Sequence, residues 1–272
     1  MPVLEIRNLE LHVTHACNLA CESCSHYSNQ HHAGHLDLDE AERWMRAWAP
    51  RVQPRTFSLL GGEPSIHPRL AEFIPLTRRY FHDSRLRLVT NGFFLHRHPE
   101  LPWALRDDPH AELHLSVHHS SAEYMDRLQP ALDLVEGWVN EHRIRLVLYV
   151  SHRHWTRRYH GFGAEMRPFE DGLPRQSWDA CPAKYCTQLH DGRIWKCPPL
   201  AYLPMQAAKH SMSSAWQPYL HYKPLDSDCS EAELAAFFAR EDERFCGMCP
   251  ARPERMDLPN PLPASNLPRY AE

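Results

Sequence analysis

The chain has 272 residues, of which 43% are hydrophobic and 24% are charged, and its formal net charge is −4. This composition is typical of a folded globular protein, and the lack of a basic excess argues against a general nucleic-acid binder. No apolar run approaches the roughly 20 residues that cross a bilayer, and the N-terminal segment lacks the pattern of a secretory signal. We therefore expect a cytoplasmic protein with no membrane or nucleic-acid partner.

Short apolar segments that predict strands alternate with stretches of helical periodicity. The predicted strands are 9–13, 57–60, 86–89, 113–117 and 144–150, and the predicted helices are 38–49, 70–81 and 122–141. This alternation predicts βα units and a parallel sheet, hence an α/β fold. A sixth strand would fall between residues 160 and 180.

The pattern changes after about residue 175. Residues 188–195 predict a hairpin that turns at Asp191-Gly192, and Ser230 with Glu233 predicts a capping box at the start of a helix. Six prolines between residues 250 and 272 predict an irregular tail. The expected organisation is therefore a first domain over 1–175, a second over 176–252 and a tail over 253–272.

The chain contains nine cysteines, an odd number that fits poorly with a pure disulfide framework in a reducing compartment. Cys17, Cys21 and Cys24 follow the first predicted strand with C-x3-C-x2-C spacing. Three thiolates on one loop can hold a four-iron cluster and leave one iron open. A zinc site, completed by His15 or His26, is the alternative.

Two further motifs stand at predicted strand ends. Gly61-Gly62-Glu63-Pro64 ends the second strand, where two glycines permit close backbone approach and the carboxylate can pair with an ammonium group. Asn91 lies in the Thr-Asn-Gly sequence that ends the third strand, and Ser116 lies on the fourth. Ordinary strand-end turns are the alternative for both of these residues.

The cysteine loop, the GGEP sequence and the TNG sequence together resemble the radical SAM superfamily. The resemblance implies a partial (βα)6-type barrel and a [4Fe-4S] cluster whose open iron chelates S-adenosylmethionine (SAM). It implies that Gly61, Gly62, Glu63 and Pro64 hold the methionine amino group and that Asn91 and Ser116 contact the ribose or carboxylate. Members usually have an aromatic residue before the third cysteine, near the adenine. This chain has Ser23 there, so Tyr27 or His26 would take that place.

The later cysteines resemble the ligands of the SPASM and twitch extensions of that superfamily. Cys181 and Cys197 are spaced around Gly192, and Cys246 and Cys249 form a C-x2-C pair. The resemblance implies the shorter twitch form, with one auxiliary [4Fe-4S] cluster on these four cysteines. Cys186 competes with Cys181 for one position, and a structural zinc ribbon is the alternative.

Several other residues have two interpretations. Cys186 and Cys229 could donate a hydrogen atom to a substrate radical, or be buried and inert. His118, at the end of the fourth predicted strand, is an acid–base candidate or a packed histidine. The histidines at 31, 32 and 35 predict a solvated loop rather than metal ligands. The basic stretch 153–160 could hold a substrate phosphate or be a solvated charge run.

The function that follows from the resemblance is SAM cleavage to a 5′-deoxyadenosyl radical, which abstracts a hydrogen atom from the substrate. We expect a small-molecule substrate, such as a sugar or cyclitol, that is dehydrogenated or epimerised, with flavodoxin or ferredoxin as electron donor. A peptide maturase with a separate leader-binding partner is one alternative. A two-site zinc protein that acts as an interaction module is the other.

Overall fold

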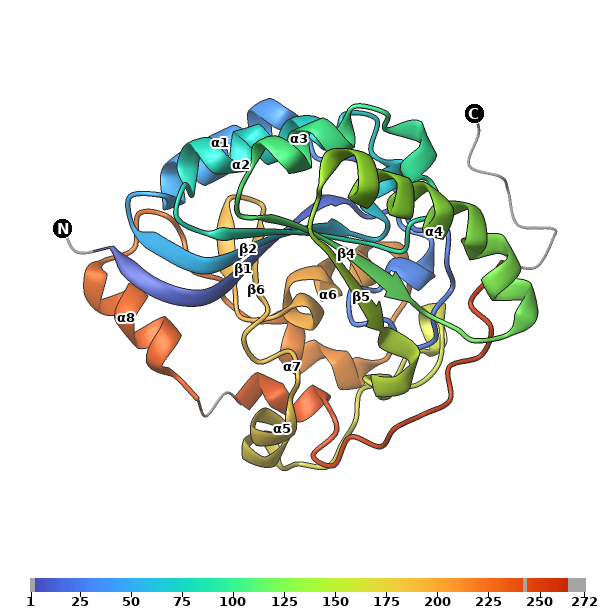
Figure 1. Cartoon of the computed structure of the whole chain (residues 1–272). Helices are drawn as coiled ribbons and strands as arrows, with labels where there is room; N and C mark the ends of the chain where they lie inside the picture. Colours follow the sequence, from blue (N-terminus) through green and yellow to red (C-terminus); the bar gives the residue numbers. More distant parts are fainter. Residues whose placement is uncertain (1–2, 242–243, 264–272) are drawn as a thin grey trace.

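A computed structural model of the chain describes residues 3–241 and 244–263. Within these residues the centre is a seven-stranded sheet in the order β5-β4-β3-β2-β1-β6-β7 (Figure 1). Strands β1 to β6 are parallel to their neighbours, and β7 is antiparallel to β6. The strands are β1 (Leu4–Thr14), β2 (Val52–Gly61), β3 (Arg85–Thr90), β4 (Ala111–Val117), β5 (Leu146–Val150), β6 (Thr187–His190) and β7 (Arg193–Trp195). This open, mostly parallel sheet confirms the predicted α/β fold and fits a partial barrel.

Helices lie on both sides of the sheet (Figure 1). One layer holds α1 (Leu38–Trp48), α2 (Phe73–Tyr80), α3 (Leu101–Asp107) and α4 (Ala122–His142). The other side holds α5 (Pro174–Ala180), α6 (Pro198–Lys209), α7 (Gln217–Leu220) and α8 (Glu231–Ala239). None of the described helices combines the length and hydropathy that a membrane crossing needs.

Local signals explain where these elements begin. The Asp37 side chain accepts hydrogen bonds from the backbone N–H groups of residues 39 and 40, which caps α1. Ser230 and Glu233 form the predicted capping box of α8. The predicted helix 70–81 is divided into a 3-10 turn at Leu70–Glu72 followed by α2. The hairpin turns at Asp191 and Gly192, which both have positive φ, as a two-residue type I′ turn requires.

The sixth parallel strand is not between residues 160 and 180, where the described chain forms α5 and irregular backbone. It is β6, the first strand of the hairpin, and it pairs with β1 rather than with β5. Only four residues long, β6 is held by Gln188, whose side chain donates to Glu10 of β1 at 2.6 Å. The predicted second domain therefore shares its sheet with the first.

Beyond α8 the described chain has no further α-helix or strand, and it runs back over the loop that follows β1. The backbone N–H of Ala20 donates to the carbonyl of Pro261 at 2.8 Å, and that of Met256 donates to Trp155 at 3.0 Å. Leu258 is buried against Leu19. The last part of the predicted tail, 264–272, lies outside the described residues.

Candidate active site

A cavity of about 180 Å³ lies at the carboxyl edge of the sheet, where ligands bind in open α/β folds. Its walls come from the loop after β1, from the ends of β2, β3 and β4, and from the segment after β5. The lining includes Cys17, Cys21, Cys24, His26, Gly61, Gly62, Glu63, Asn91, Ser116, His118 and Trp155. The structure thus brings the three motifs of the sequence analysis to one place. Pro64 stands beside the cavity as the first residue of a 3-10 turn.

Of the thiols of the cysteine loop, that of Cys21 is buried and those of Cys17 and Cys24 are half-buried. Burial raises the pKa of Cys17 and of Cys21. Burial acts in the same sense on Cys24, but its hydrogen bond and charge interaction with His26 prevail and lower the pKa. Ionised thiols in such a place need a compensating cation, and three soft sulfur donors on one loop suit an iron–sulfur cluster. No three His, Cys, Asp or Glu side chains in residues 3–241 and 244–263 are gathered closely enough to chelate a single metal ion.

The GGEP turn is fastened to the cysteine loop through its backbone. Gly62 donates to the carbonyl of Thr14 at 2.9 Å, and Glu63 donates to that of Ala16 at 2.8 Å. A Cβ atom on Gly61 would collide with the carbonyl oxygen of Thr14, and one on Gly62 with that of Ala16. Glycine is therefore required at both positions because the two backbones touch.

The Glu63 carboxylate is buried and accepts hydrogen bonds from several groups. Its Oε1 accepts from the Ser65 backbone at 2.9 Å and from the hydroxyls of Ser65 and Thr90. Within residues 3–241 and 244–263, its Oε2 accepts a single hydrogen bond, from the Asn91 backbone at 2.7 Å. Burial raises the pKa of Glu63, and these hydrogen bonds oppose that effect. The carboxylate therefore organises two strand ends, and Oε2 keeps acceptor capacity toward the cavity.

Asn91 joins the third strand to the cysteine loop. Its Nδ2 donates to Oδ1 of Asn18 at 2.8 Å, and its own Oδ1 accepts from the backbone of Phe93 at 3.2 Å. Sequence reasoning missed Asn18, whose signal was only its place next to Cys17. Ser116 lines the cavity from β4, as the sequence suggested.

His118 contacts the cysteine loop from β4. Its Nδ1 lies 3.6 Å from the Cys21 sulfur and 3.2 Å from the hydroxyl of Ser151. Burial lowers its pKa from 6.5 to about 4, so the ring is neutral near pH 7. The predicted acid–base histidine therefore adjoins a candidate cluster ligand.

The segment after β5 binds the cysteine loop through hydrogen bonds and an ion pair. The Ser23 hydroxyl oxygen accepts from the backbone N–H groups of Arg158 at 2.7 Å and Tyr159 at 3.0 Å, and it donates to the carbonyl of Tyr159 at 3.0 Å. Trp155 Nε1 donates to the carbonyl of Glu22 at 2.8 Å, and Arg157 forms an ion pair with the Glu22 carboxylate. Part of this basic stretch thus holds the loop in place, whereas Arg153 is exposed, as a solvated run predicts.

Two candidates for adenine contact differ in position. Tyr27 is buried and packs on Tyr159, with ring centroids 5.2 Å apart. His26 lines the cavity. Trp155 also lines it, with its ring 5.8 Å from His118, and sequence analysis had not assigned it to the adenine. Its position just past a strand end was the available signal.

A second, smaller cavity of about 30 Å³ is lined by Cys181, Cys197, Cys246 and Cys249. Burial raises the pKa of Cys197, and the charges of the other three thiols add to this effect. Ser25, directly after the cysteine loop, lines both cavities. The two cavities therefore share a wall at Ser25.

The two spare cysteines lie elsewhere. Cys186 is half-buried beside Glu10, and desolvation, followed by the charge and hydrogen bond of that carboxylate, raises its pKa. The carbonyl of Cys229 accepts from Arg51, near the start of α8. Burial and nearby carboxylates raise the pKa of Cys229, which disfavours a thiolate at this helix start. Neither cysteine lines the two cavities described above.

The three loop histidines do not share one environment. His31 and His35 are exposed, whereas His32 is buried and contacts Gln206. Burial lowers the pKa of His32 to about 4. The prediction of a solvated loop is therefore wrong for His32, because α6 covers it.

Sequence analysis also missed a histidine on β1. His12 is buried, stacks on Tyr202 with ring centroids 4.3 Å apart and lies 4.7 Å from the ring of His26. Neither of its ring nitrogens has a hydrogen-bond partner in the described part of the chain. Burial lowers its pKa well below 6.5.

The sequence model of the Radical SAM superfamily matches residues 11–156, more than half of the chain and the whole of the first cavity's framework. The chain belongs to the radical SAM superfamily. Members of this superfamily are enzymes that use a [4Fe-4S] cluster and SAM, and the thiols of the first cavity suit such a cluster.

Solved structures agree with this radical SAM assignment. BtrN, in complex with AdoMet and 2-DOIA, matches with a TM-score of 0.52 and 18% identity over 94% of this chain and 99% of that chain. This level of identity shows the shared fold alone. No curated protein matches the sequence.

Partial matches include two longer radical SAM structures. One is anSMEcpe with bound AdoMet and Cp18Cys peptide, with a TM-score of 0.42 and 14% identity over 53% of this chain and 42% of that chain. The other is SuiB of Streptococcus suis, with a TM-score of 0.43 and 17% identity over 54% of this chain and 33% of that chain. Each of these two matches covers less than half of the matched structure.

Proposed function

We propose that this radical SAM protein abstracts a hydrogen atom from a carbon of a small-molecule substrate, such as a sugar or cyclitol. The observation that carries the proposal is the shared cavity of Cys17, Cys21 and Cys24 with Glu63 and the ends of three strands. When bound, the cluster and SAM supply a 5′-deoxyadenosyl radical. The chain's own side chains bind and orient the reactants and exclude water.

Each wall of the cavity has a proposed role. Oε2 of Glu63, which accepts one internal hydrogen bond, would bind the methionine ammonium, with Gly61 and Gly62 allowing close approach. Asn91 and Ser116 would bind the ribose or the carboxylate. Trp155 would stack on the adenine, because its indole is held by Glu22 and lines the cavity.

The second cavity supports an auxiliary four-iron cluster of the twitch type. Its four thiols come from separated segments and line one space, and Cys181 is among them whereas Cys186 lies beside Glu10. We therefore assign Cys181, Cys197, Cys246 and Cys249 as ligands. Four cysteine ligands leave no open iron, so this site would serve electron transfer or structure.

Dehydrogenation is the reaction that these positions favour. After losing a hydrogen atom, the substrate would have to lose one electron and one proton, and a cluster held by the thiols of the second cavity would accept the electron. Epimerisation would instead need a hydrogen-atom donor that reaches the substrate, and both spare thiols lie outside the two cavities. A reduced flavodoxin or ferredoxin would supply the electron that starts each turnover.

The test is anaerobic incubation of reconstituted protein with SAM, a reductant and panels of sugars, cyclitols and peptides. We expect 5′-deoxyadenosine to form in amounts that depend on one sugar or cyclitol, and not in a Cys21→Ala variant. Stimulation by peptides alone would overturn the small-molecule proposal. A colourless protein that binds zinc and forms no 5′-deoxyadenosine would overturn the assignment of both clusters.

Reaction type is tested with the identified substrate in deuterated water. We expect Cys186→Ala and Cys229→Ala to retain turnover and the product to carry no deuterium at the reacting carbon. Deuterium incorporation by the wild type, together with loss of turnover in one variant that still forms 5′-deoxyadenosine, would establish epimerisation and identify the donor.

A further inference from the structure

Strand β5 is an edge strand of the sheet (Figure 1). Three of its apolar side chains are exposed. Val147 is 37% exposed, Leu148 is 56% exposed and Tyr149 is 47% exposed. Successive side chains of a strand point to opposite faces, so apolar surface is open on both faces of β5. Proteins usually shield such an edge, because it can pair with another chain.

The backbone of β5 has an unpaired row of hydrogen-bonding groups. The N–H of Leu113 on β4 donates to the carbonyl of Arg145 at 2.8 Å, which places residue 145 and alternate residues after it toward β4. The N–H and C=O groups of Leu146 and Leu148 therefore point to the free side. Among the described residues, β4 is the only strand paired with β5.

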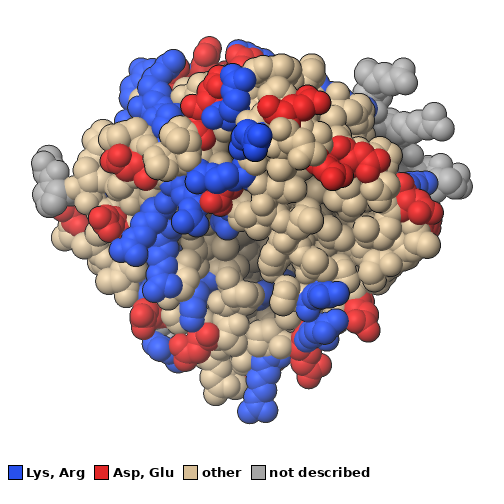
Figure 2. Space-filling model, in the orientation of Figure 1, with Lys and Arg blue, Asp and Glu red and all other residues tan. Residues whose placement is uncertain are grey.

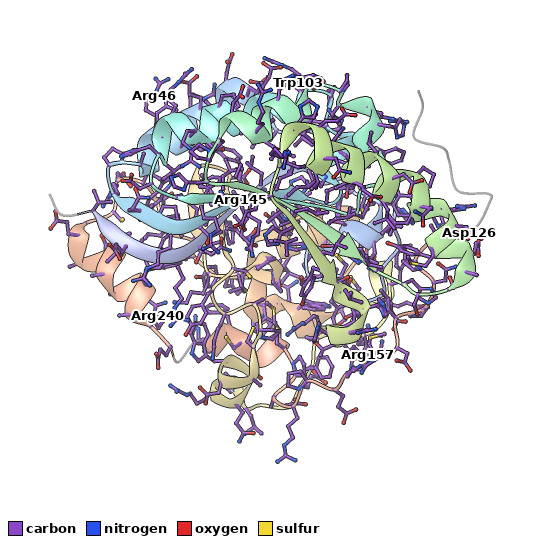
Figure 3. The ribbon with its side chains drawn as sticks, in the orientation of Figure 1. Arg46, Trp103, Asp126, Arg145, Arg157 and Arg240 are labelled. Carbon is purple, nitrogen blue, oxygen red and sulfur yellow. The ribbon has the colours of Figure 1, made fainter. Side chains whose placement is uncertain are left out.

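Positive charge surrounds this edge. Arg143 and Arg145 precede β5, Arg153 follows it, and all three are exposed. No Asp or Glu occurs between Arg143 and Arg158. Figure 2 shows Lys and Arg side chains bordering a hollow in the centre of this face, and Figure 3 places Arg145 near the start of β5 and Arg157 beyond its end.

The nearest carboxylate on the neighbouring strand is already engaged. Glu112 of β4 lies 3.1 Å from His114 and 3.8 Å from Arg85. The cations beside β5 are thus not balanced by acids of the same segment. An incoming segment that carries carboxylates would meet complementary charge at both ends of the strand.

The edge also leads to the first cavity. Tyr149 is in register with Ser116, which lines that cavity. Ser151, directly after β5, donates to the carbonyl of Val117 at 3.0 Å and contacts His118 at 3.2 Å. A segment lying along β5 would therefore have one end beside the candidate active site.

We propose that an extended acidic peptide segment of a partner adds a strand to the free edge of β5. Its backbone pairs with Leu146 and Leu148, its alternate apolar side chains cover Val147, Leu148 and Tyr149, and its carboxylates bind Arg143, Arg145 and Arg153. This inference goes beyond the proposed function and does not depend on which small molecule is the substrate.

The test is selection of a random peptide-display library on the full-length, cluster-loaded protein. We expect enriched sequences to be rich in Asp and Glu with apolar residues at alternate positions. A synthetic copy of the best sequence should bind in fluorescence anisotropy. Binding should weaken at least about tenfold in Leu148→Pro, which removes an outward N–H, and in Arg145→Glu.

Controls separate strand pairing from simple charge attraction. Arg46→Glu changes an exposed arginine on helix α1, away from β5, and should leave the affinity for the peptide unchanged (Figure 3). A peptide N-methylated at alternate backbone nitrogens should lose affinity for unaltered protein, which keeps the test valid if Leu148→Pro does not fold. Because the readout is binding, its failure is distinct from failure to form 5′-deoxyadenosine.

Several results would overturn the proposal. They are a library without enrichment, enriched peptides without acidic bias, and affinity that N-methylation and Arg145→Glu leave unchanged. A dimer that Leu148→Pro abolishes would place a second copy of the chain on the edge instead.

Discussion

Ser23 and Tyr159 are joined by two hydrogen bonds, although 136 residues separate them in the chain. The Ser23 oxygen accepts from the Tyr159 N–H, and its hydroxyl donates to the Tyr159 carbonyl, both at 3.0 Å. Ser23 has a positive φ of 58° and is buried, so its side chain is turned into the protein. This pair holds the cysteine loop against the segment that carries Trp155.

Ser23→Ala should destabilise the cysteine loop, because it leaves the buried N–H groups of Arg158 and Tyr159 without an acceptor. We expect a loss of about 1–3 kcal/mol in unfolding free energy and faster release of iron from the first site. Urea unfolding and chelator-trapped iron release measure the two effects. Ser120→Ala, at an exposed serine, is the control. Equal iron release in the two variants would contradict a role for the Ser23 hydroxyl.

Glu63→Gln should impair both SAM binding and the local structure. The amide group of glutamine would direct N–H donors at the hydroxyl and backbone donors that now bind the carboxylate. We expect SAM affinity to fall more than about tenfold, since a charge-assisted hydrogen bond contributes about 1.5–3 kcal/mol. Equilibrium titration measures this loss, with Glu72→Gln as an exposed control. Wild-type SAM affinity in Glu63→Gln would remove this residue from the site.

Cys181 and Cys186 should differ in their effect on iron content. Two four-iron clusters predict about eight irons per chain after anaerobic reconstitution. We expect Cys181→Ala to lose much of the iron of the second site and Cys186→Ala to retain all of it, because only Cys181 lines the second cavity. The triple variant Cys17→Ala, Cys21→Ala, Cys24→Ala should keep about half of the iron. Loss of iron in Cys186→Ala but not in Cys181→Ala would reverse the ligand assignment.

His12→Phe should reduce the sensitivity of stability to acid. Burial lowers the pKa of His12 well below 6.5, so the unfolded chain binds this proton more readily than the folded chain. The stability that the neutral ring contributes is fully present above the pKa of His12 in the unfolded chain. It is lost as the pH falls below that pKa toward the lower pKa of His12 in the folded chain. Between pH 6.5 and about pH 5, wild type should lose about 1–2 kcal/mol more than the variant.

Urea unfolding at the two pH values measures the difference. The variant should be at least as stable as wild type at pH 6.5, because it removes two buried nitrogens that have no described partner. His31→Phe, at an exposed histidine, is the control. An identical pH dependence in His12→Phe and wild type would contradict the shifted pKa.

The sequence by itself determined the features that depend on neighbouring residues. The spacing of Cys17, Cys21 and Cys24 and the turn at Asp191-Gly192 are local patterns, and each could be predicted because its physical requirement falls within a few residues. The two glycines before Glu63 could be recognised as a motif, but the contact with Thr14 and Ala16 that requires them is tertiary. Strand–helix alternation likewise predicted the parallel sheet, and parallel strands necessarily bring their carboxyl ends to one edge.

Only the tertiary structure decided which distant segments meet. Cys186 does not line the second cavity because it lies beside Glu10 of β1, and the role of Ser23 depends on a segment that follows β5. Tertiary structure likewise decided that β6 pairs with β1, because a strand of four residues carries too little pattern to indicate its partner. It also decided the place of Trp155, whose indole is held at the cavity by a hydrogen bond to the Glu22 carbonyl. Such contacts arise from packing between elements far apart in the chain, so no periodicity or spacing within one segment encodes them.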